Sequence, residues 1–223
     1  MSMKITFLGH AAFLIQSGDV RIAIDPFLTG NPVATLEAKD LDVDHIVLTH
    51  GHEDHFGDTI DIAKRCDATI YGAYEICTYC GEQGIEKCQP GNPGGQIATD
   101  FGSVAFTQAF HSSSYQGRYM GMPCGVVIRA GGATFYHTGD TALFSDMRLI
   151  GELYQPDIAA ICIGDRFTMG PAHASKAADL INADTVIPMH YKTWPLLAES
   201  ADAFQPTRSE VKELAPGESV TVG

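Results

Sequence analysis

Short apolar runs separated by turn residues dominate the first part of the chain. Residues 3–8, 12–17 and 20–24 form three such runs, with Gly, His, Ser and Asp between them. This spacing predicts three strands joined by tight turns, an antiparallel meander. The run Ile-Val-Leu-Thr at 46–49 is apolar without alternation, and it predicts a buried strand.

The rest of the chain alternates between segments with helical and with strand patterns. Helices are expected where apolar residues recur at helical spacing and where capping residues begin or end a run. They cover residues 58–65, 74–84, 143–154, 173–182 and a short segment from about 196. Strands are expected at 68–71, 96–99, 102–110, 123–130, 133–137, 158–163, 185–188 and 219–222. Two groups of strands with interleaved helices predict an α/β fold in which two packed sheets carry helices outside. The length suits a single domain, 1–223.

Four residues with metal-binding side chains follow the strand at 46–49. They are His50, His52, Asp54 and His55, within six residues. In an extended loop, side chains two residues apart point the same way, so His50 and His52 can bind one ion while Asp54 and His55 face a second. Gly51 gives the loop the backbone freedom to bend. Neutral imidazole suits zinc, and a carboxylate adds charge. A single His at a strand end is usually structural, but four such residues together indicate a metal site.

The segment Thr-His-Gly-His-Glu-Asp-His resembles the T-H-x-H-x-D-H signature of the metallo-β-lactamase superfamily. The other landmarks of that superfamily follow in the expected order: Asp25, His111, Asp140 in Thr-Gly-Asp-Thr and His190 in Pro-Met-His-Tyr. Phe-Leu-Gly-His-Ala-Ala-Phe, Phe-Thr-Met-Gly and His-Tyr-Lys-Thr-Trp-Pro resemble one subgroup, the small metal-dependent hydrolases related to ascorbate-6-phosphate lactonases. The resemblance covers nearly the whole chain and implies a four-layer αββα sandwich.

The resemblance also implies a dinuclear site. His50, His52 and His111 would bind the first ion, Asp54, His55 and His190 the second, and Asp140 both. Two divalent ions are therefore expected, zinc first, with manganese or iron left open. The flavodiiron branch carries Glu where this chain has His52, which favours hydrolytic over redox chemistry. A hydroxide between the ions would attack the substrate, and Asp54 would orient it and transfer its proton.

Further residues receive roles around that site. Asp25 is expected to orient an imidazole from behind, with a simple turn residue as the alternative. The subgroup resemblance places His10 at the mouth of the site, as a substrate-orienting or proton-donating group. His173 could stabilise an oxyanion from a loop that crosses the site, or be an exposed helix residue.

Four substrate-contacting residues are predicted from chain position. Lys192 and Trp194 follow His190 directly, so both are expected near the metals, with Lys192 binding an anionic group. The polar loop at 112–121 follows His111 and is predicted to form the substrate rim, where Tyr115 and Arg118 would determine specificity. A plain mobile loop is the alternative.

Composition limits the partners and the compartment. The formal net charge of −13 argues against nucleic acid as a partner, because the field of the protein repels polyanions. With neither a signal peptide nor an apolar run of membrane-spanning length, we expect a cytoplasmic protein that does not bind membranes. The six cysteines are then expected to be reduced. Cys77 and Cys80 share a predicted helix face and are interpreted as packed side chains, with a zinc knuckle that includes Cys66 and Cys88 as the alternative.

The resemblance to the lactonases implies a hydrolase that acts on a small-molecule ester or lactone. A phosphodiesterase is the second hypothesis, because the same kind of site handles both substrates. The rival from another class is a sensor that binds a ligand through the metals without turnover. Resemblance to small hydrolases that assemble predicts a homo-oligomer.

Overall fold

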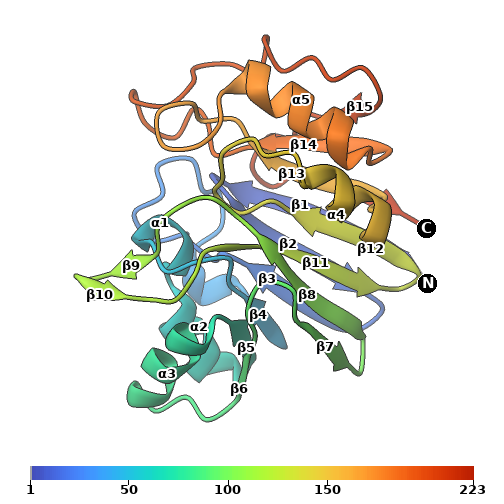
Figure 1. The fold of residues 1–223 in the computed structure, drawn as a ribbon. Helices are drawn as coiled ribbons and strands as arrows, with labels where there is room; N and C mark the ends of the chain where they lie inside the picture. Colours follow the sequence, from blue (N-terminus) through green and yellow to red (C-terminus); the bar gives the residue numbers. More distant parts are fainter. Residues whose placement is uncertain (1) are drawn as a thin grey trace.

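The computed structural model describes residues 2–223 and contains two seven-stranded sheets that pack face to face (Figure 1). The first sheet has the strand order β16-β1-β2-β3-β4-β5-β6. Its strands are β1 (Met3–Gly9), β2 (Ala12–Ser17), β3 (Val20–Ile24), β4 (His45–Val47), β5 (Thr69–Gly72), β6 (Cys88–Pro90) and β16 (Ser219–Val222). The strands from β16 to β3 are antiparallel, and those from β3 to β6 are parallel.

The second sheet has the order β15-β14-β13-β12-β11-β8-β7. Its strands are β7 (Gln96–Thr99), β8 (Gly102–Gln108), β11 (Cys124–Ala130), β12 (Ala133–His137), β13 (Ile158–Cys162), β14 (Thr185–Met189) and β15 (Glu210–Val211). Like the first sheet, it is part antiparallel, from β7 to β12, and part parallel, from β12 to β15.

Helices cover the outer faces of both sheets (Figure 1). The first half of the chain carries η1 (Ala38–Asp40), α1 (Glu53–Phe56), α2 (Thr59–Cys66) and α3 (Tyr74–Glu82), and the second half carries α4 (Met147–Tyr154) and α5 (Pro171–Ile181). A small hairpin of β9 (Ser114–Tyr115) and β10 (Arg118–Tyr119) projects from the body beside α1. This arrangement confirms the predicted αββα sandwich.

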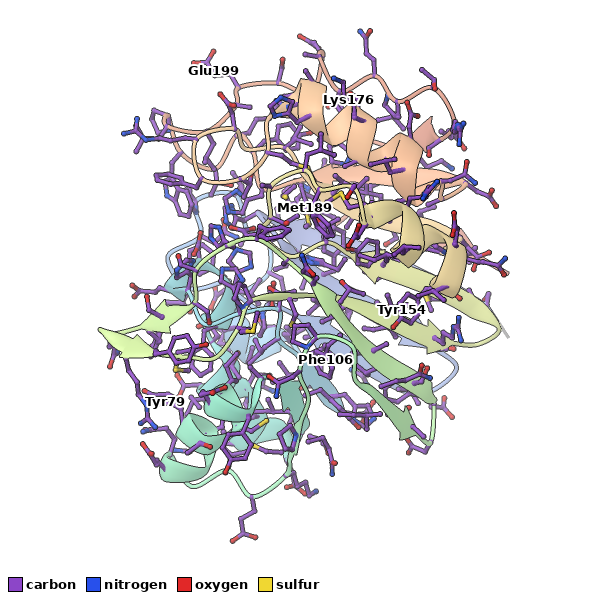
Figure 2. All side chains as sticks on the ribbon, viewed as in Figure 1. Tyr79, Phe106, Tyr154, Lys176, Met189 and Glu199 are labelled. Atoms are coloured by element: carbon purple, nitrogen blue, oxygen red, sulfur yellow. The ribbon has the colours of Figure 1, made fainter. Side chains whose placement is uncertain are left out.

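The main core joins apolar side chains of both sheets with those of α4 and α5, so it fills the space between the sheets and continues beneath these two helices. Phe13, Val126 and Ile161 belong to this core, as do Phe106 and Met189, which are labelled in Figure 2. A second apolar cluster fills the space between the first sheet and helices α1–α3, and includes Ile46, Phe56 and Ile76. No helix within residues 2–223 combines the length and the apolar character that a membrane crossing requires.

The structure corrects several predicted elements. Asp54 and His55 lie in the one-turn helix α1, not in an extended loop. The segment from about 196 contains turns and β15 where a short helix was predicted, and α4 begins at Met147, four residues later than expected. The helix expected at 58–65 begins at Thr59, and the Asp58 side chain does not cap it. The Asp58 carboxylate accepts hydrogen bonds from the N–H groups of Leu28 and Thr29.

Candidate metal centre

All seven predicted metal-binding side chains lie in segments that follow the ends of β4, β8, β12 and β14. Three groups have ligand atoms within 4.8 Å of one another. His50, His52 and His111 form the first, and His10, Asp54, His55 and His190 form the second. Asp25, His50 and His55 form a third, which shares one member with each of the others. The structure therefore brings together the two predicted ligand triads and adds His10 to the second.

Asp140 lies between the two groups. Its Oδ2 is 3.5 Å from His111 Nε2, in the first group, and 2.9 Å from His190 Nε2, in the second. Its Oδ1 is 3.3 Å from His55 Nε2. One carboxylate thus contacts both groups, as the predicted bridging position requires.

Several buried atoms of the cluster have no hydrogen-bond partner within residues 2–223. They are Nε2 of His55, both ring nitrogens of His190 and Oδ1 of Asp140. Buried polar atoms without partners cost free energy, and buried charges are normally paired or bound to metals. His190 Nδ1 faces Gly164, away from the cluster. The other three atoms, one each on His55, His190 and Asp140, fit a divalent cation as the missing partner.

The electrostatics of the cluster lead to the same conclusion. Burial opposes the charge on Asp140, yet His190 and His55 hold the pKa of its carboxyl well below the usual range. Burial also opposes a charge on His190, but Asp140 beside it raises the pKa of that imidazole to about 9. Without a cation, protons on the imidazoles must therefore balance the buried carboxylate.

Each imidazole on the loop after β4 is held through its second nitrogen. Thr49 Oγ1 donates to Asp25 Oδ2 at 2.6 Å, so it can accept from His50 Nδ1 at 3.0 Å. His52 Nε2 lies 3.2 Å from Ser112 Oγ. The remaining nitrogens, His50 Nε2 and His52 Nδ1, face each other at 3.0 Å. Such outer partners fix the tautomer and orientation of metal-binding imidazoles.

Asp25 is fully buried and orients the second group from behind. It accepts hydrogen bonds from the Thr49 N–H at 2.9 Å, from the Thr49 hydroxyl, and from His55 Nδ1 at 2.7 Å. These contacts are those expected of a residue that orients an imidazole. Sequence reasoning missed Thr49 and Ser112, although both adjoin predicted ligands in the sequence.

His10 is buried between the cluster and the segment that follows His190. Burial lowers the pKa of its imidazole to about 4, so the ring is neutral near pH 7. Its Nε2 lies 3.1 Å from Asp54 Oδ2, and a carboxylate can only accept, so Nε2 carries the proton. Its Nδ1 then accepts from the Thr193 hydroxyl at 2.7 Å. His10 thereby holds one oxygen of Asp54 in place.

Three residues of this centre adopt a strained backbone conformation. His10, Asp25 and His190 adopt the left-handed region, with φ values of 59°, 45° and 61°. Non-glycine residues in that region cost free energy and often mark functional sites. Gly51 differs from the expectation, because its φ is not positive; a Cβ there would lie 2.3 Å from Cβ of Met120. Close packing, rather than backbone freedom, explains Gly51.

The predicted substrate residues lie in different surroundings. The Trp194 ring is 4.8 Å from that of His10, beside the centre. Lys192 Nζ lies 3.9 Å from Glu213, and the Arg118 guanidinium pairs with Glu82. Both cations are thus already paired with carboxylates, and neither is placed among the ligand side chains.

The two remaining candidates lie outside the ligand groups. The Tyr115 ring packs 4.8 Å from that of Phe56 and 5.6 Å from that of Tyr79, so the base of the rim hairpin is apolar. His173 is exposed in the first turn of α5, and neither ligand group includes it. Solvent reaches the centre through His52, Asp54 and His111, which are partly exposed, whereas the other four predicted ligands are buried.

Comparison with known proteins places this centre in a family. Residues 4–190 match the family model described as the beta-lactamase superfamily domain. The chain is 47% identical to a UPF0173 metal-dependent hydrolase of Bacillus cytotoxicus, over 99% of this chain and 100% of the relative. It is 48% identical to one of Anoxybacillus flavithermus, over 91% and 92%.

A solved structure agrees. Igni18, a metallo hydrolase from the archaeon Ignicoccus hospitalis, superposes with a TM-score of 0.91 at 35% identity, covering 100% of this chain and 99% of Igni18. The chain therefore belongs to the metallo-β-lactamase superfamily, in the UPF0173 family of metal-dependent hydrolases.

Proposed function

We propose that this metal-dependent hydrolase uses two divalent ions, zinc first, to cleave a small uncharged ester or lactone. The observation that carries the proposal is Asp140, whose two oxygens contact both ligand groups while buried ligand atoms lack partners. When bound, a pair of divalent ions supplies an acidified water and polarises the substrate carbonyl.

Asp54 and His10 would prepare the water molecule that attacks the substrate. Asp54 contacts His10 and His190 through Oδ2, which leaves Oδ1 to accept a proton from an attacking water. Its side chain is 27% exposed, so it can exchange that proton with solvent. His10 acts as a positioning residue, because it holds Asp54 Oδ2 in place while Asp54 Oδ1 accepts the proton from water.

The surroundings support an uncharged substrate over a phosphodiester. Lys192, which was predicted to bind an anionic group, and Arg118, which was predicted to lie at the substrate rim, are each paired with a glutamate. Trp194 and Phe27 flank His10 and give the centre an apolar wall. The formal net charge of −13 adds a long-range penalty for anions.

The test compares substrates on one protein preparation. Metal is removed with a chelator and restored as zinc, manganese or iron, and hydrolysis of a nitrophenyl ester, a lactone and bis(nitrophenyl) phosphate is measured. We expect metal-dependent cleavage of the ester or lactone, loss of that cleavage in His111→Ala, and no change in Asp100→Asn, an exposed control.

Two outcomes would contradict the proposal. Faster cleavage of the phosphodiester than of either carbonyl substrate would favour a phosphodiesterase. Metal-dependent protection of the fold by esters or lactones, with no turnover under any metal, would favour the sensor.

A further inference from the structure

His137 ends strand β12 of the second sheet, and its imidazole contacts the main chain of both sheets. Its Nε2 lies 2.9 Å from the carbonyl oxygen of Ala11, in the turn between β1 and β2 of the first sheet (Figure 1). Its Nδ1 lies 3.0 Å from the backbone nitrogen of Gly139. A carbonyl oxygen can only accept and a backbone N–H can only donate, so Nε2 carries the proton and Nδ1 accepts. The two contacts therefore fix both the tautomer and the orientation of the ring.

The ring lies in an apolar part of the core. His137 is fully buried, and its ring is 5.6 Å from that of Phe13 and 6.5 Å from that of Phe135. A buried polar ring costs free energy unless its nitrogens are hydrogen-bonded, whereas an apolar side chain could fill the same volume without that requirement. Packing alone therefore does not explain a histidine at this position, but its two hydrogen bonds do.

The turn at one end of this link also contacts two candidate ligands. His10 and Ala11 form the two-residue turn that joins β1 to β2. The side chain of His10 holds Asp54, and the carbonyl oxygen of His10 accepts from the N–H group of His190 at 2.7 Å. The position of this turn therefore helps to set the positions of two members of the second ligand group.

The other end of the link adjoins the predicted bridging residue. Gly139 directly precedes Asp140 and has a φ of 60°. A Cβ on Gly139 would lie 2.4 Å from the carbonyl oxygen of Cys124, so the main chain here approaches another strand too closely for a side chain. The main chain before Asp140 is thus held by close packing and by the directional hydrogen bond to His137.

We propose that His137 is a positioning residue that sets the spacing between Asp140 and the second ligand group. It is separated from Ala11 by 126 positions in the sequence, and the hydrogen bond between them joins the two sheets. One end of the ring contacts the turn that holds Asp54 and His190, and the other contacts the residue before Asp140. No candidate ligand group among residues 2–223 includes His137, so it acts through these neighbours. The inference rests on the proposed pair of ions, because a centre with one ion has no such spacing.

The effect is expected at one of the two metal sites. The first ligand group is held by other contacts, those of Thr49 with His50 and of Ser112 with His52. Loss of the hydrogen bond between the sheets should therefore weaken the site of the second group and spare the site of the first.

Two substitutions separate the hydrogen bonds of the ring. In His137→Gln the side-chain amide nitrogen can donate to Ala11 in place of Nε2. In His137→Asn the shorter amide can accept from Gly139 but does not reach Ala11. Tyr136→Phe is the matched control, because Tyr136 is the neighbouring residue of β12, is fully buried and loses only a hydroxyl that accepts from Thr107.

The experiment measures the two stepwise zinc dissociation constants of the full chain by competition with a chromophoric chelator. The urea midpoint of the metal-free chain is measured beside them. In His137→Asn we expect one dissociation constant to rise about tenfold or more, the usual effect of losing an outer contact of a metal site, while the other stays close to that of the parent. His137→Gln should keep both constants close to those of the parent, and Tyr136→Phe should change neither.

A measurement on the parent keeps the test decisive if the variants do not fold. Long-range ¹H–¹⁵N spectra of the metal-free chain, labelled at the histidine nitrogens, should show His137 as a neutral ring with its proton on Nε2. The opposite tautomer or a doubly protonated ring would overturn the proposal, because neither can make both contacts.

The outcomes separate this inference from the proposed function. If His137→Asn lowered the urea midpoint and left both dissociation constants unchanged, His137 would be a core residue only, and the inference alone would be wrong. Equal weakening of one site in His137→Asn and His137→Gln would show that the bond to Ala11 is not responsible. A parent that bound a single zinc ion would contradict both the inference and the two-ion centre. A parent that bound two ions and cleaved neither ester nor lactone would contradict the proposed function alone.

Discussion

Asp140 is the residue on which the charge balance of the centre depends. It is buried and contacts imidazoles of both ligand groups. The isosteric change Asp140→Asn removes its negative charge and keeps its shape. We expect the metal content to fall below two per chain, and activity to fall roughly 100-fold or more, because both ions would lose a ligand.

Elemental mass spectrometry of the purified variant measures the content, and Asp100→Asn serves as a control because its carboxylate is exposed. If Asp140→Asn still contained two metal ions per chain, the bridging role of Asp140 would be wrong.

His190 gives the centre a dependence on pH. Its pKa is raised to about 9, so the metal-free protein carries a proton there at neutral pH. A cation must displace that proton before the nitrogen can bind it. We therefore expect metal uptake to release protons, and affinity to rise with pH until about pH 9.

Titration calorimetry in two buffers of different ionisation enthalpy, at several pH values, counts the protons released. The sign follows from the raised pKa, since the proton competes below it and is gone above it. Affinity that is constant from pH 6 to pH 9 would contradict this assignment.

At the scale of elements, the contact between α1 and the segment after β3 sets the position of two ligands. Gly57 ends α1 with φ of 38°, and a Cβ there would lie 2.5 Å from Cα of Phe27 and 2.7 Å from the carbonyl oxygen of Pro26. We expect Gly57→Ala to cost about 1–3 kcal/mol through overpacking and to weaken metal binding, because α1 carries Asp54 and His55.

Gly84→Ala is the matched control. Gly84 also has a positive φ, of 85°, but a Cβ there would meet nothing within 4 Å. Only the backbone penalty of about 1 kcal/mol should remain, with metal binding unchanged. Urea unfolding with and without metal measures both effects, and equal losses in the two variants would show that the α1 contact is unimportant.

Elements with a strong local signal were predictable, and those that depend on distant partners were not. The meander β1–β3 and the parallel strands β13 and β14 are mostly apolar, and their predicted bounds agree with the structure to within one residue. β9, β10 and β15 have two residues each, too few for any periodicity. Where a helix was predicted from about 196, the following segment instead contacts α5, since Asp179 accepts from the N–H groups of Thr207 and Arg208.

The contacts of the metal centre also differ in how far they could be predicted from the sequence. The seven candidate ligands could be named because the family resemblance assigns their positions, and the structure brings these side chains together at four strand ends. The Thr193 contact of His10 could not, since it joins residues 183 apart in the chain through loop geometry. The pairing of Lys192 with Glu213 could not be predicted for the same reason. Glu213 lies two residues after β15, and the position of that strand brings it to Lys192.

At the scale of the whole molecule, the last strand completes the first sheet. β16 pairs with β1 from Met3↔Val222 to Thr6↔Ser219 and covers an otherwise open edge. Removing residues 219–223 should expose that edge and cost about 2 kcal/mol, a fall of roughly 4–8 °C in Tm, with a tendency to aggregate. The metal content should not change, because β16 carries no ligand.

Calorimetric melting tests this expectation against a chain that lacks only Gly223. A truncated chain as stable as that control would show that β16 adds nothing to the sheet.

The same pairing brings the start and the end of the chain together. A short glycine linker could join them, and the chain could be reopened at the turn between Gly91 and Gly95, where the first sheet gives way to the second. The rearranged protein would begin with β7 and finish with β6, with His111, Asp140 and His190 preceding His50 in sequence. The Thr49–His55 segment, which comes first among the candidate ligands in this sequence, would then come last. The centre depends on which strand ends lie together in space. The order of its candidate ligands along the sequence can therefore change without changing the centre.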